Sequence, residues 1–249
     1  MSSTLERSLQ KAFGAVSPHV PLSVKRPIKR AIPKRYHRYV DPEWHRWAIG
    51  GMWDALGELQ FKYLIDRGLK PEHTLLDVGC GPLRGGIRFI EYLEPGNYTG
   101  VEKDWRKLEA GRDVELPAHG LVDKRPQLVV MENFDFPSLG RGFDYAIAQS
   151  VFTHLPINQI IRCVVQMSRV LNPGGQFFAT FYENKDGKQN LDPVEQKPGL
   201  LTHFDQDFFH YDYGTFEWVA DGTGLEVEHL GEWDNPRNQR MLVFRKPAA

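Results

Sequence analysis

Cysteine is scarce in this sequence, because Cys80 and Cys163 are the only two among 249 residues. Neither lies at a spacing that would hold a metal, so the sequence predicts neither a zinc site nor a disulfide scaffold. So few cysteines are typical of a protein in a reducing, cytoplasmic compartment. Long apolar runs are also missing, and none approaches the roughly 20 residues that cross a bilayer. We therefore expect no transmembrane helix.

The net charge is close to zero, at −1, but the basic and acidic residues are unevenly distributed along the chain. Residues 1–40 hold nine lysine and arginine residues and a single acidic residue, Glu6, so the rest of the chain is net acidic. We interpret residues 1–40 as a basic, flexible segment, either a solvated tail or a surface that attracts anionic membrane lipid or another polyanion. Residues 41–249 are expected to form the globular domain.

Short apolar runs alternate with segments of helical spacing from residue 74 onward. Five runs are predicted to be buried strands: Thr74–Val78, Asn97–Val101, Gln127–Met131, Asp144–Ala148 and Gly175–Phe181. Residues 157–171, between the last two strands, carry a broad apolar face at three- and four-residue steps, as do residues 52–64 before the first strand. Strands that alternate with helices indicate a parallel sheet covered on both faces.

The C-terminal region has a different pattern. Segments 225–230 and 240–245 are apolar or alternating, and the connection between them is rich in Gly, Asn and Pro. We predict an antiparallel strand pair there. The predicted fold class is therefore α/β, with a doubly wound, mostly parallel sheet that ends in an antiparallel pair.

The dinucleotide-binding fingerprint GxGxxG is absent, although a glycine-rich turn follows the first predicted strand. The stretch LLDVGCGPLRGG, residues 75–86, holds four glycines, and such a turn brings a ligand against the backbone at a helix N-terminus. Asp77, two residues before Gly79, would repel a diphosphate but attract a cationic ligand. Glu102, at the end of the second predicted strand, is placed to bind the two hydroxyls of a ribose. These features predict a nucleoside that carries positive charge.

Five motifs then carry a resemblance to a known family: LLDVGCGPLRGG, YTGVEKD, ENFDFP, FDYAIAQSVFTHLP and LNPGGQFFATFY. In order and spacing they resemble the class I S-adenosylmethionine-dependent methyltransferases, over about residues 70–245. The whole chain looks like bacterial members that act on glycans and small molecules. The resemblance implies a Rossmann-like sheet, S-adenosylmethionine as cofactor and S-adenosylhomocysteine as product. Leu83 stands where the family has its third glycine, which is a departure from the pattern.

The resemblance also implies which residues hold the methionine end and the ribose of the cofactor. Asp77 and the turn residues Gly79, Cys80 and Gly81 would face the methionine part, and Glu102 would bind the ribose diol. Arg84 has two interpretations. It either pairs with the cofactor's carboxylate, since arginine suits bidentate recognition, or is a solvated charge on the first turn of a helix.

Four further residues are implied as cofactor contacts. Phe134 would lie beside the adenine ring, and Asp135 would bond the adenine amino group. Gln149 and Ser150, at the end of the fourth predicted strand, would line the cofactor near the transferred methyl.

A general base is needed if the acceptor is a hydroxyl, and two residues are candidates. His154 follows the fourth strand, where open α/β sheets bind ligands, and is the first choice; the alternative is a histidine that packs against the cofactor turn. Glu183, just past the fifth strand, would serve as a base or bind the acceptor, unless it is an ordinary loop carboxylate.

Residues 183–214 are predicted to be an insert that forms the acceptor site. Its aromatic, His and Asp residues would wall a pocket, with His203, His210 and Tyr211 as the substrate-binding candidates. The same residues, with Asp207, would suit a divalent ion, but we do not predict a metal site. In a third interpretation they begin an ordinary helix with Asp205 as its N-cap.

The acceptor class follows from this composition. Aromatic faces with carboxylates suit sugars, so we favour O-methylation of a hydroxyl on a saccharide or polysaccharide precursor. A small-molecule natural product or a lipid is the second candidate. The Asn/Asp-Pro-Pro-aromatic signature of DNA amino methylation is absent, and no nucleic-acid partner is expected. Two other classes stay open, a nicotinamide-dependent oxidoreductase and a cofactor-binding module without catalysis. Oligomeric state does not follow from the sequence.

Overall fold

The computed structural model describes residues 43–184 and 191–248. The chain divides into two compact units, Met1–Trp53 and Asp54–Ala249. The predicted basic segment, residues 1–40, lies outside the described residues, so its contact with anionic membranes stays a prediction. In the described part of the first unit, helix α4 (Trp44–Ala48) places the ring of His45 5.9 Å from that of Trp53.

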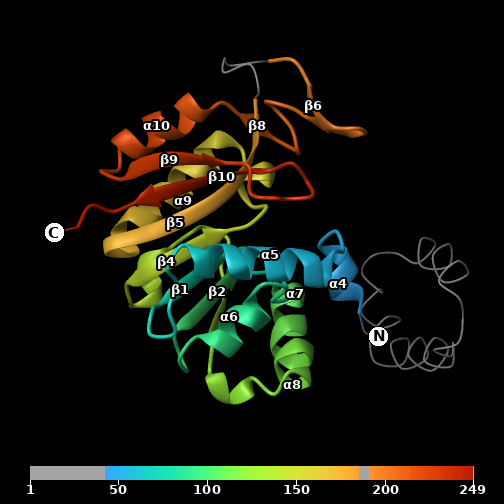
Figure 1. The fold of residues 1–249 in the computed structure, drawn as a ribbon, viewed down its shortest axis with the longest axis vertical. Coiled ribbons are helices and arrows are strands. Elements are labelled where there is room, and N and C mark those ends of the chain that lie inside the picture. Colours follow the sequence, from blue (N-terminus) through green and yellow to red (C-terminus); the bar gives the residue numbers. More distant parts are fainter. Residues whose placement is uncertain (1–42, 185–190, 249) are drawn as a thin grey trace, which may run out of the picture. The chain divides into compact units, whose positions relative to one another are not determined.

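The second unit is built on a mixed sheet in the order β3-β2-β1-β4-β5-β10-β9, with β8 paired to β5 (Figure 1). Strands β1 to β5 pair in parallel, and β10 is antiparallel to both β5 and β9. The strands are β1 (Leu75–Val78), β2 (Tyr98–Glu102), β3 (Gln127–Val130), β4 (Phe143–Ala148), β5 (Leu171–Glu183), β8 (His210–Tyr211), β9 (Glu226–Gly231) and β10 (Arg240–Arg245). This confirms the predicted Rossmann-like doubly wound sheet with its C-terminal antiparallel pair.

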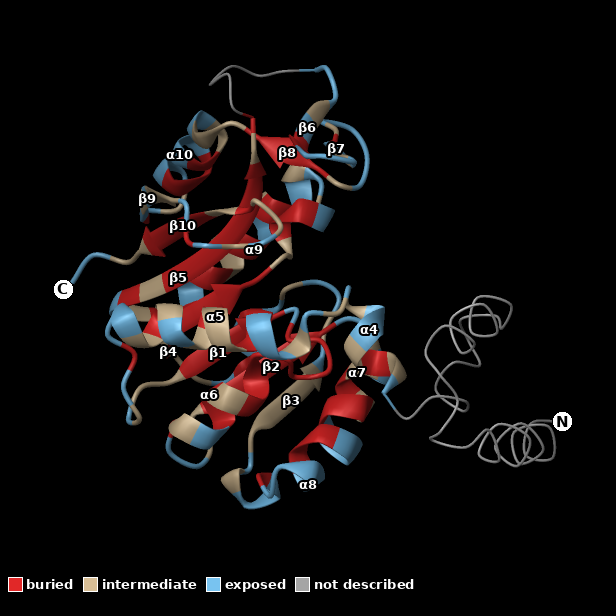
Figure 2. Cartoon of the chain, turned by 45° about the vertical axis from the view of Figure 1, so that its right-hand side comes forward, coloured by how far each residue is buried: buried red, intermediate tan, exposed pale blue. Residues whose placement is uncertain are grey.

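Helices cover both faces of this sheet. Side chains of α5, α6 and α7 share one hydrophobic cluster, while those of α9 and α10 share the other. The helices are α5 (Trp53–Asp66), α6 (Gly86–Tyr92), α7 (Trp105–Ala110), α8 (Leu116–Ala118), α9 (Ile157–Val170) and α10 (Tyr213–Asp221). The inner strands β1, β2, β4, β5 and β10 are mostly buried between these helices, whereas the edge strands β3 and β9 are partly exposed (Figure 2).

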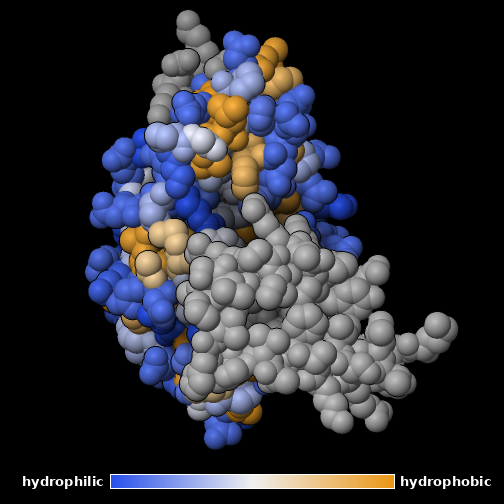
Figure 3. Space-filling view, turned by 90° about the vertical axis from the view of Figure 1, so that its right-hand side faces the viewer, coloured by the Kyte–Doolittle hydropathy of each residue, from blue (hydrophilic) through white to orange (hydrophobic). Residues whose placement is uncertain are grey.

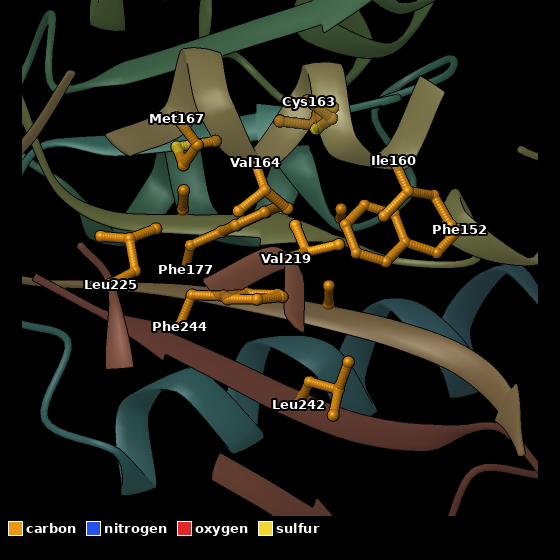
Figure 4. Close-up of a cluster of buried hydrophobic side chains, with 14 of the residues drawn as sticks. Phe152, Ile160, Cys163, Val164, Met167, Phe177, Val219, Leu225, Leu242 and Phe244 are labelled. Carbon is orange, nitrogen blue, oxygen red and sulfur yellow. The ribbon is translucent and has the colours of Figure 1, made fainter. Parts of the chain in front are cut away.

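The core on the α9 face explains why residues 157–171 carry an apolar stripe. Ile160, Val164 and Met167 are fully buried, and they point from α9 toward Phe177 of β5 and Phe244 of β10 (Figure 4). The last two rings lie 5.8 Å apart. Burial of a side chain of this size contributes about 1.5–3 kcal/mol. The stripe therefore fixes α9 against the sheet and holds the end of β4, which precedes it.

The predicted insert forms strands of its own. A hairpin joins β6 (Val194–Lys197) to β7 (Leu200–Thr202), and β8 then extends the main sheet beside β5. The next helix, α10, begins at Tyr213, and Asp212 caps it by accepting from the backbone N–H of Thr215 at 3.1 Å. The interpretation of Asp205 as the N-cap was wrong, because its segment is an irregular turn eight residues before that helix.

The described residues were compared with what a membrane span requires, and their exposed hydrophobic side chains were located. Across residues 43–184 and 191–248, no helix is long and apolar enough to cross a membrane. Large hydrophobic side chains are exposed on the insert at Leu191, Leu201 and Phe204. Hydrophobic patches interrupt a mainly hydrophilic surface in Figure 3.

Candidate cofactor and acceptor site

The glycine turn after β1 folds back onto the end of β2. The N–H groups of Gly79 and Cys80 both donate to the carbonyl of Val101, at 2.8 and 3.1 Å, and that of Gly81 donates to Oε2 of Glu102 at 3.0 Å. Pro82 has no N–H. A phosphate-binding turn needs N–H groups that point at the ligand, and none from residue 79 to 82 is available. These four positions therefore offer no N–H group to a phosphate.

Two glycines of this turn adopt conformations that other residues avoid. Gly79 and Gly81 have φ of 70° and 56°. A Cβ built on Gly79 would lie 2.7 Å from Cγ2 of Val151, which follows β4. The first glycine is thus required both by its backbone angle and by the close approach of the chain after β4.

Leu83, which replaces the family's third glycine, also adopts a left-handed conformation, with φ of 70°. Its side chain is fully buried. Room for it is provided by Gly86 and Gly111, where an added Cβ would come within 2.9 and 2.7 Å of Leu83 side-chain atoms. The packing of the Leu83 side chain offsets the strain of this left-handed conformation, which is about 1–2 kcal/mol.

Asp77 lies at the centre of this arrangement. Its Oδ2 accepts a hydrogen bond from the hydroxyl of Tyr98 at 2.7 Å, and its side chain is buried. Burial raises the pKa of Asp77 to about 7, against the opposing effects of the Tyr98 hydrogen bond and the Arg84 charge. A carboxylate that is costly to ionise when alone is stabilised by a ligand cation beside it.

Arg84 is buried too, which decides against the solvated interpretation. Its side chain is 7% exposed. Desolvation, with the nearby charge of Arg237, lowers the pKa of Arg84 to about 10. Cys80 is also buried, and burial raises the pKa of its thiol. The proposed pairing of Arg84 with the cofactor's carboxylate stays a prediction.

Glu102 bridges two segments at the end of β2. Besides Gly81, it accepts from the backbone N–H of Asp104, through Oε1 at 2.9 Å. Beyond β3, Phe134 is half-buried and has φ of 58°, while Asp135 is exposed. These residues lie at the carboxyl ends of adjacent strands, where open α/β sheets bind ligands. The geometry is compatible with ribose and adenine contacts, which stay predictions.

Beyond β4, a polar network joins the end of that strand to β5 and to the loop before β10. The backbone N–H of Ser150 donates to Oγ1 of Thr180 at 2.7 Å, and the Ser150 hydroxyl donates to Oε1 of Gln239 at 3.0 Å. Gln149 donates from Nε2 to the Ser150 hydroxyl at 2.9 Å. Among the described residues, its other amide atom, Oε1, is buried without a hydrogen-bond partner. Such an atom marks a place where a ligand donor would be stabilised.

The structure brings His154 together with the insert. Its Nδ1 lies 2.7 Å from Oδ1 of Asp207, and its ring lies 4.8 Å from that of Phe208. The ring of Phe208 is in turn 6.0 Å from that of Tyr182, on β5. The backbone N–H of Phe209 donates to the carbonyl of Thr153 at 2.9 Å, which joins the two segments. His154, Asp207, Phe208 and Tyr182 together are called the acceptor cluster below.

Glu183 lies apart from the acceptor cluster. It is the last residue of β5 and not a loop residue beyond it. Its Oε1 lies 2.9 Å from Nε2 of His229, and its Oε2 lies 3.3 Å from Nε of Arg240. It alternates with Tyr182 along the strand, so the two side chains point to opposite faces. Catalysis by Glu183 stays a prediction that this geometry does not favour.

The remaining insert candidates are mainly packed within the fold. His210 is buried, with Nδ1 3.0 Å from the hydroxyl of Thr202. Tyr211 is buried too, and its hydroxyl donates to the carbonyl of Leu155 at 2.6 Å. His203 donates its N–H to the carbonyl of Phe208 at 2.7 Å. These contacts shape the insert around the acceptor cluster, and direct contact of the three with a substrate stays a prediction. No group of three metal-ligating side chains occurs within the described ranges.

Sequence reasoning missed the contribution of the loop between β9 and β10. Gln239 is 2% exposed and joins the network beyond β4, while Arg237 is half-buried. The loop is held by the indole of Trp233, which donates to the carbonyl of Gln239 at 3.0 Å. No local signal marks these residues, because their partners are 59 to 89 positions away.

Comparison with known proteins bears on what this site is. Residues 76–177 match a family described as "Methyltransferase domain". The chain is 27% identical over 165 residues to Cycloartenol-C-24-methyltransferase 1 of Oryza sativa subsp. japonica. The aligned segment covers 63% of this chain and 46% of that relative. Residues 76–177 of this chain form a methyltransferase domain. The aligned parts span less than half the length of the curated relatives it matches.

Solved structures show the same fold as this methyltransferase domain. Magnesium protoporphyrin IX methyltransferase of Synechocystis PCC 6803 with bound S-adenosylmethionine has a TM-score of 0.56 at 12% identity, over 78% of this chain and 82% of that one. A putative O-methyltransferase of Nostoc punctiforme PCC 73102 has a TM-score of 0.60 at 14% identity, over 82% of this chain and 60% of that one. At these identities the likeness concerns the fold alone.

Proposed function

We propose that the protein transfers the methyl group of S-adenosylmethionine to a hydroxyl of a saccharide or polysaccharide precursor. The observation that carries the proposal is the 2.7 Å contact between His154 and Asp207, just beyond β4. It supplies an imidazole whose Nδ1 is held by a carboxylate, which leaves Nε2 to accept a proton. The network beyond β4, which the resemblance assigns to the cofactor, directly precedes His154 in the chain.

The residues of the turn fit the cofactor. Asp77 offers a buried carboxylate to a cation, and Gln149 offers a buried oxygen without a partner. The backbone N–H groups of Gly79, Cys80 and Gly81 are bonded within the chain and are not offered to a diphosphate. These features support a sulfonium nucleoside over a nicotinamide dinucleotide.

The chemistry assigned to this chain is alignment and proton removal. When bound, S-adenosylmethionine supplies an electrophilic methyl group that needs no acid for its departure. His154 would take the proton of the acceptor hydroxyl, while Asp207 holds the imidazole and stabilises the imidazolium that results. Phe208 and Tyr182 would exclude water and fix the acceptor. Alignment of this kind contributes about 7–11 kcal/mol, and a positioned base adds about 10²–10⁴-fold.

A saccharide is favoured because of what surrounds the base. Sugar rings offer apolar C–H faces that pack on aromatic rings, and the half-buried ring of Phe208, backed by the buried Tyr182, offers such a surface beside His154. Their hydroxyls need acceptors, which Asp207 provides. A small natural product or lipid is the alternative acceptor, since the names of relatives include a sterol methyltransferase and a porphyrin methyltransferase.

Labelling tests the proposal. The full chain would be incubated with methyl-labelled S-adenosylmethionine and fractionated cell extract, beside the His154→Ala variant as control. We expect label in a glycan fraction, stable to mild base as an ether is, and little label with the variant. Label in a lipid or protein fraction would contradict the saccharide, and bound cofactor without transfer to any fraction would favour a non-catalytic binding module.

A further inference from the structure

Three adjacent strands present one row of side chains toward the cofactor turn. Asp77 of β1, Ile147 of β4 and Phe178 of β5 are register partners. Since side chains alternate along strands, the next row on the same face, two residues further, consists of Gly79, Gln149 and Thr180. Gly79 has no side chain, and the side chain of Val151 lies where its Cβ would be. Gln149 is therefore the polar side chain of this row next to the glycine turn, and it is buried.

The hydrogen bonds that join Gln149 and Thr180 to Ser150 and Gln239 have a fixed direction. Oε1 of Gln239 accepts from two hydroxyls, those of Ser150 at 3.0 Å and Thr180 at 2.9 Å. Because the Ser150 hydroxyl has only one proton, which it donates to Gln239, its oxygen can only accept from Gln149. The Nε2 of Gln149 fills that position at 2.9 Å. The amide of Gln149 is therefore oriented with Oε1 away from the network.

We infer that Gln239, from the loop between β9 and β10, is a positioning residue that aims Oε1 of Gln149 at the α-ammonium of S-adenosylmethionine. The inference rests on the proposed function, since it concerns that cofactor. An ammonium is the donor this place would favour, because Oε1 is buried without a partner among the described residues and the carboxylate of Asp77 lies one row away. Hydrogen bonds to charged groups are the stronger ones.

Replacement of Gln239 would undo this orientation. In Gln239→Leu, the Ser150 hydroxyl loses its acceptor and is free to donate to Oε1 of Gln149, which then no longer faces the ligand. The network would be complete without the cofactor. In Gln239→Glu, the carboxylate still accepts from both hydroxyls, so the amide of Gln149 keeps its orientation.

Calorimetry with two ligands tests the inference without measuring activity. S-adenosylhomocysteine carries the ammonium, and 5′-methylthioadenosine lacks the whole amino-acid part. For Gln239→Leu we expect affinity for S-adenosylhomocysteine to fall about 10- to 100-fold while affinity for methylthioadenosine is unchanged. Gln239→Glu should bind both ligands as the wild type does.

Three results would overturn the inference: unchanged binding of S-adenosylhomocysteine by Gln239→Leu, equal weakening of both ligands, or a Glu variant as weak as the Leu variant. If Gln239→Leu does not fold, as judged by thermal unfolding, Gln149→Leu must show the same selective loss, and its absence would overturn the inference. A wild-type protein that binds neither ligand would instead contradict the proposed function.

Discussion

The imidazole of His154 and the carboxylate of Asp207 meet at 2.7 Å although 53 positions separate them in the sequence. One residue lies in the turn after β4 and the other in the insert between β5 and α10. The insert thus supplies the carboxylate that orients a histidine of the sheet. Under the proposed function, such a pair would give the insert a part in catalysis besides that of enclosing the acceptor.

Removal of this imidazole should affect turnover and not cofactor binding. We expect His154→Ala to lower kcat by about 10²–10⁴-fold, because the acceptor hydroxyl loses its base. Asp207→Asn should lower kcat by a smaller factor, since the ring is still contacted but the imidazolium is not stabilised. Steady-state kinetics with parallel calorimetry would measure both. Asp205→Asn, an exposed carboxylate of the same insert, is the control; a kcat loss equal to that of Asp207→Asn would contradict this account.

Cofactor affinity should depend on pH through Asp77. Its pKa is raised to about 7 by burial. The protonated form is favoured in the folded, unliganded protein, so the contribution of Asp77 to stability is present at low pH and is lost as pH rises from about 4 through 7. The cofactor's cation favours the ionised form. Affinity for S-adenosylmethionine should therefore increase about tenfold between pH 5.5 and 7.

Asp77→Asn is the matched control for this pH dependence. Its amide does not titrate, so calorimetry across the same range should give a weaker affinity that no longer rises with pH. A variant that keeps the wild-type slope would show that another group controls it.

Glu102 should contribute to binding of the nucleoside and not of the amino-acid part. In Glu102→Gln, the side chain can accept from only one of the two backbone N–H groups that the carboxylate now holds, those of Gly81 and Asp104. We expect S-adenosylhomocysteine and 5′-methylthioadenosine to lose affinity together, by about tenfold. Glu91→Gln, an exposed change on α6, is the control. Loss of only the ligand with the amino-acid part would contradict the ribose assignment.

Leu83 and Gly111 should be energetically coupled. A Cβ at position 111 would lie 2.7 Å from Cγ of Leu83. We therefore expect Gly111→Ala to lower the free energy of unfolding by about 1–3 kcal/mol in the wild type, through overpacking. In a Leu83→Ala background the same change should be neutral or stabilising, since alanine is favoured over glycine in helical backbone by about 1 kcal/mol. Urea unfolding of the four proteins measures the coupling, and additive effects would exclude it.

The fold was predictable because its signals are local. The apolar runs that become β1 to β5 and the stripe of α9 are contiguous in the sequence, and the structure shifts their ends by at most four residues. The glycine turn was also predictable, although Leu83 adopts its left-handed angle only because Gly86 and Gly111 leave room for it. Gly86 belongs to the same motif, but Gly111 follows α7 and has no local signal that links it to Leu83.

Parts of the site depended on contacts that no local pattern encodes. Glu183 looked like a free loop carboxylate, but the pleat of β5 turns it toward His229 and Arg240, which come much later in the chain. Asp207 was one acidic residue among several in the insert, and only the fold selects it as the partner of His154. Gln239 enters from the final strand pair in the same way.

Calorimetry of the full chain with two classes of nucleotide tests the central claim most directly. The claim is that the pocket beyond β1 accepts a nucleoside with a sulfonium and not one with a diphosphate. We predict heat of binding with S-adenosylmethionine and S-adenosylhomocysteine and none with oxidised or reduced nicotinamide dinucleotides. Heat from a nicotinamide dinucleotide with none from either sulfur nucleoside would contradict it.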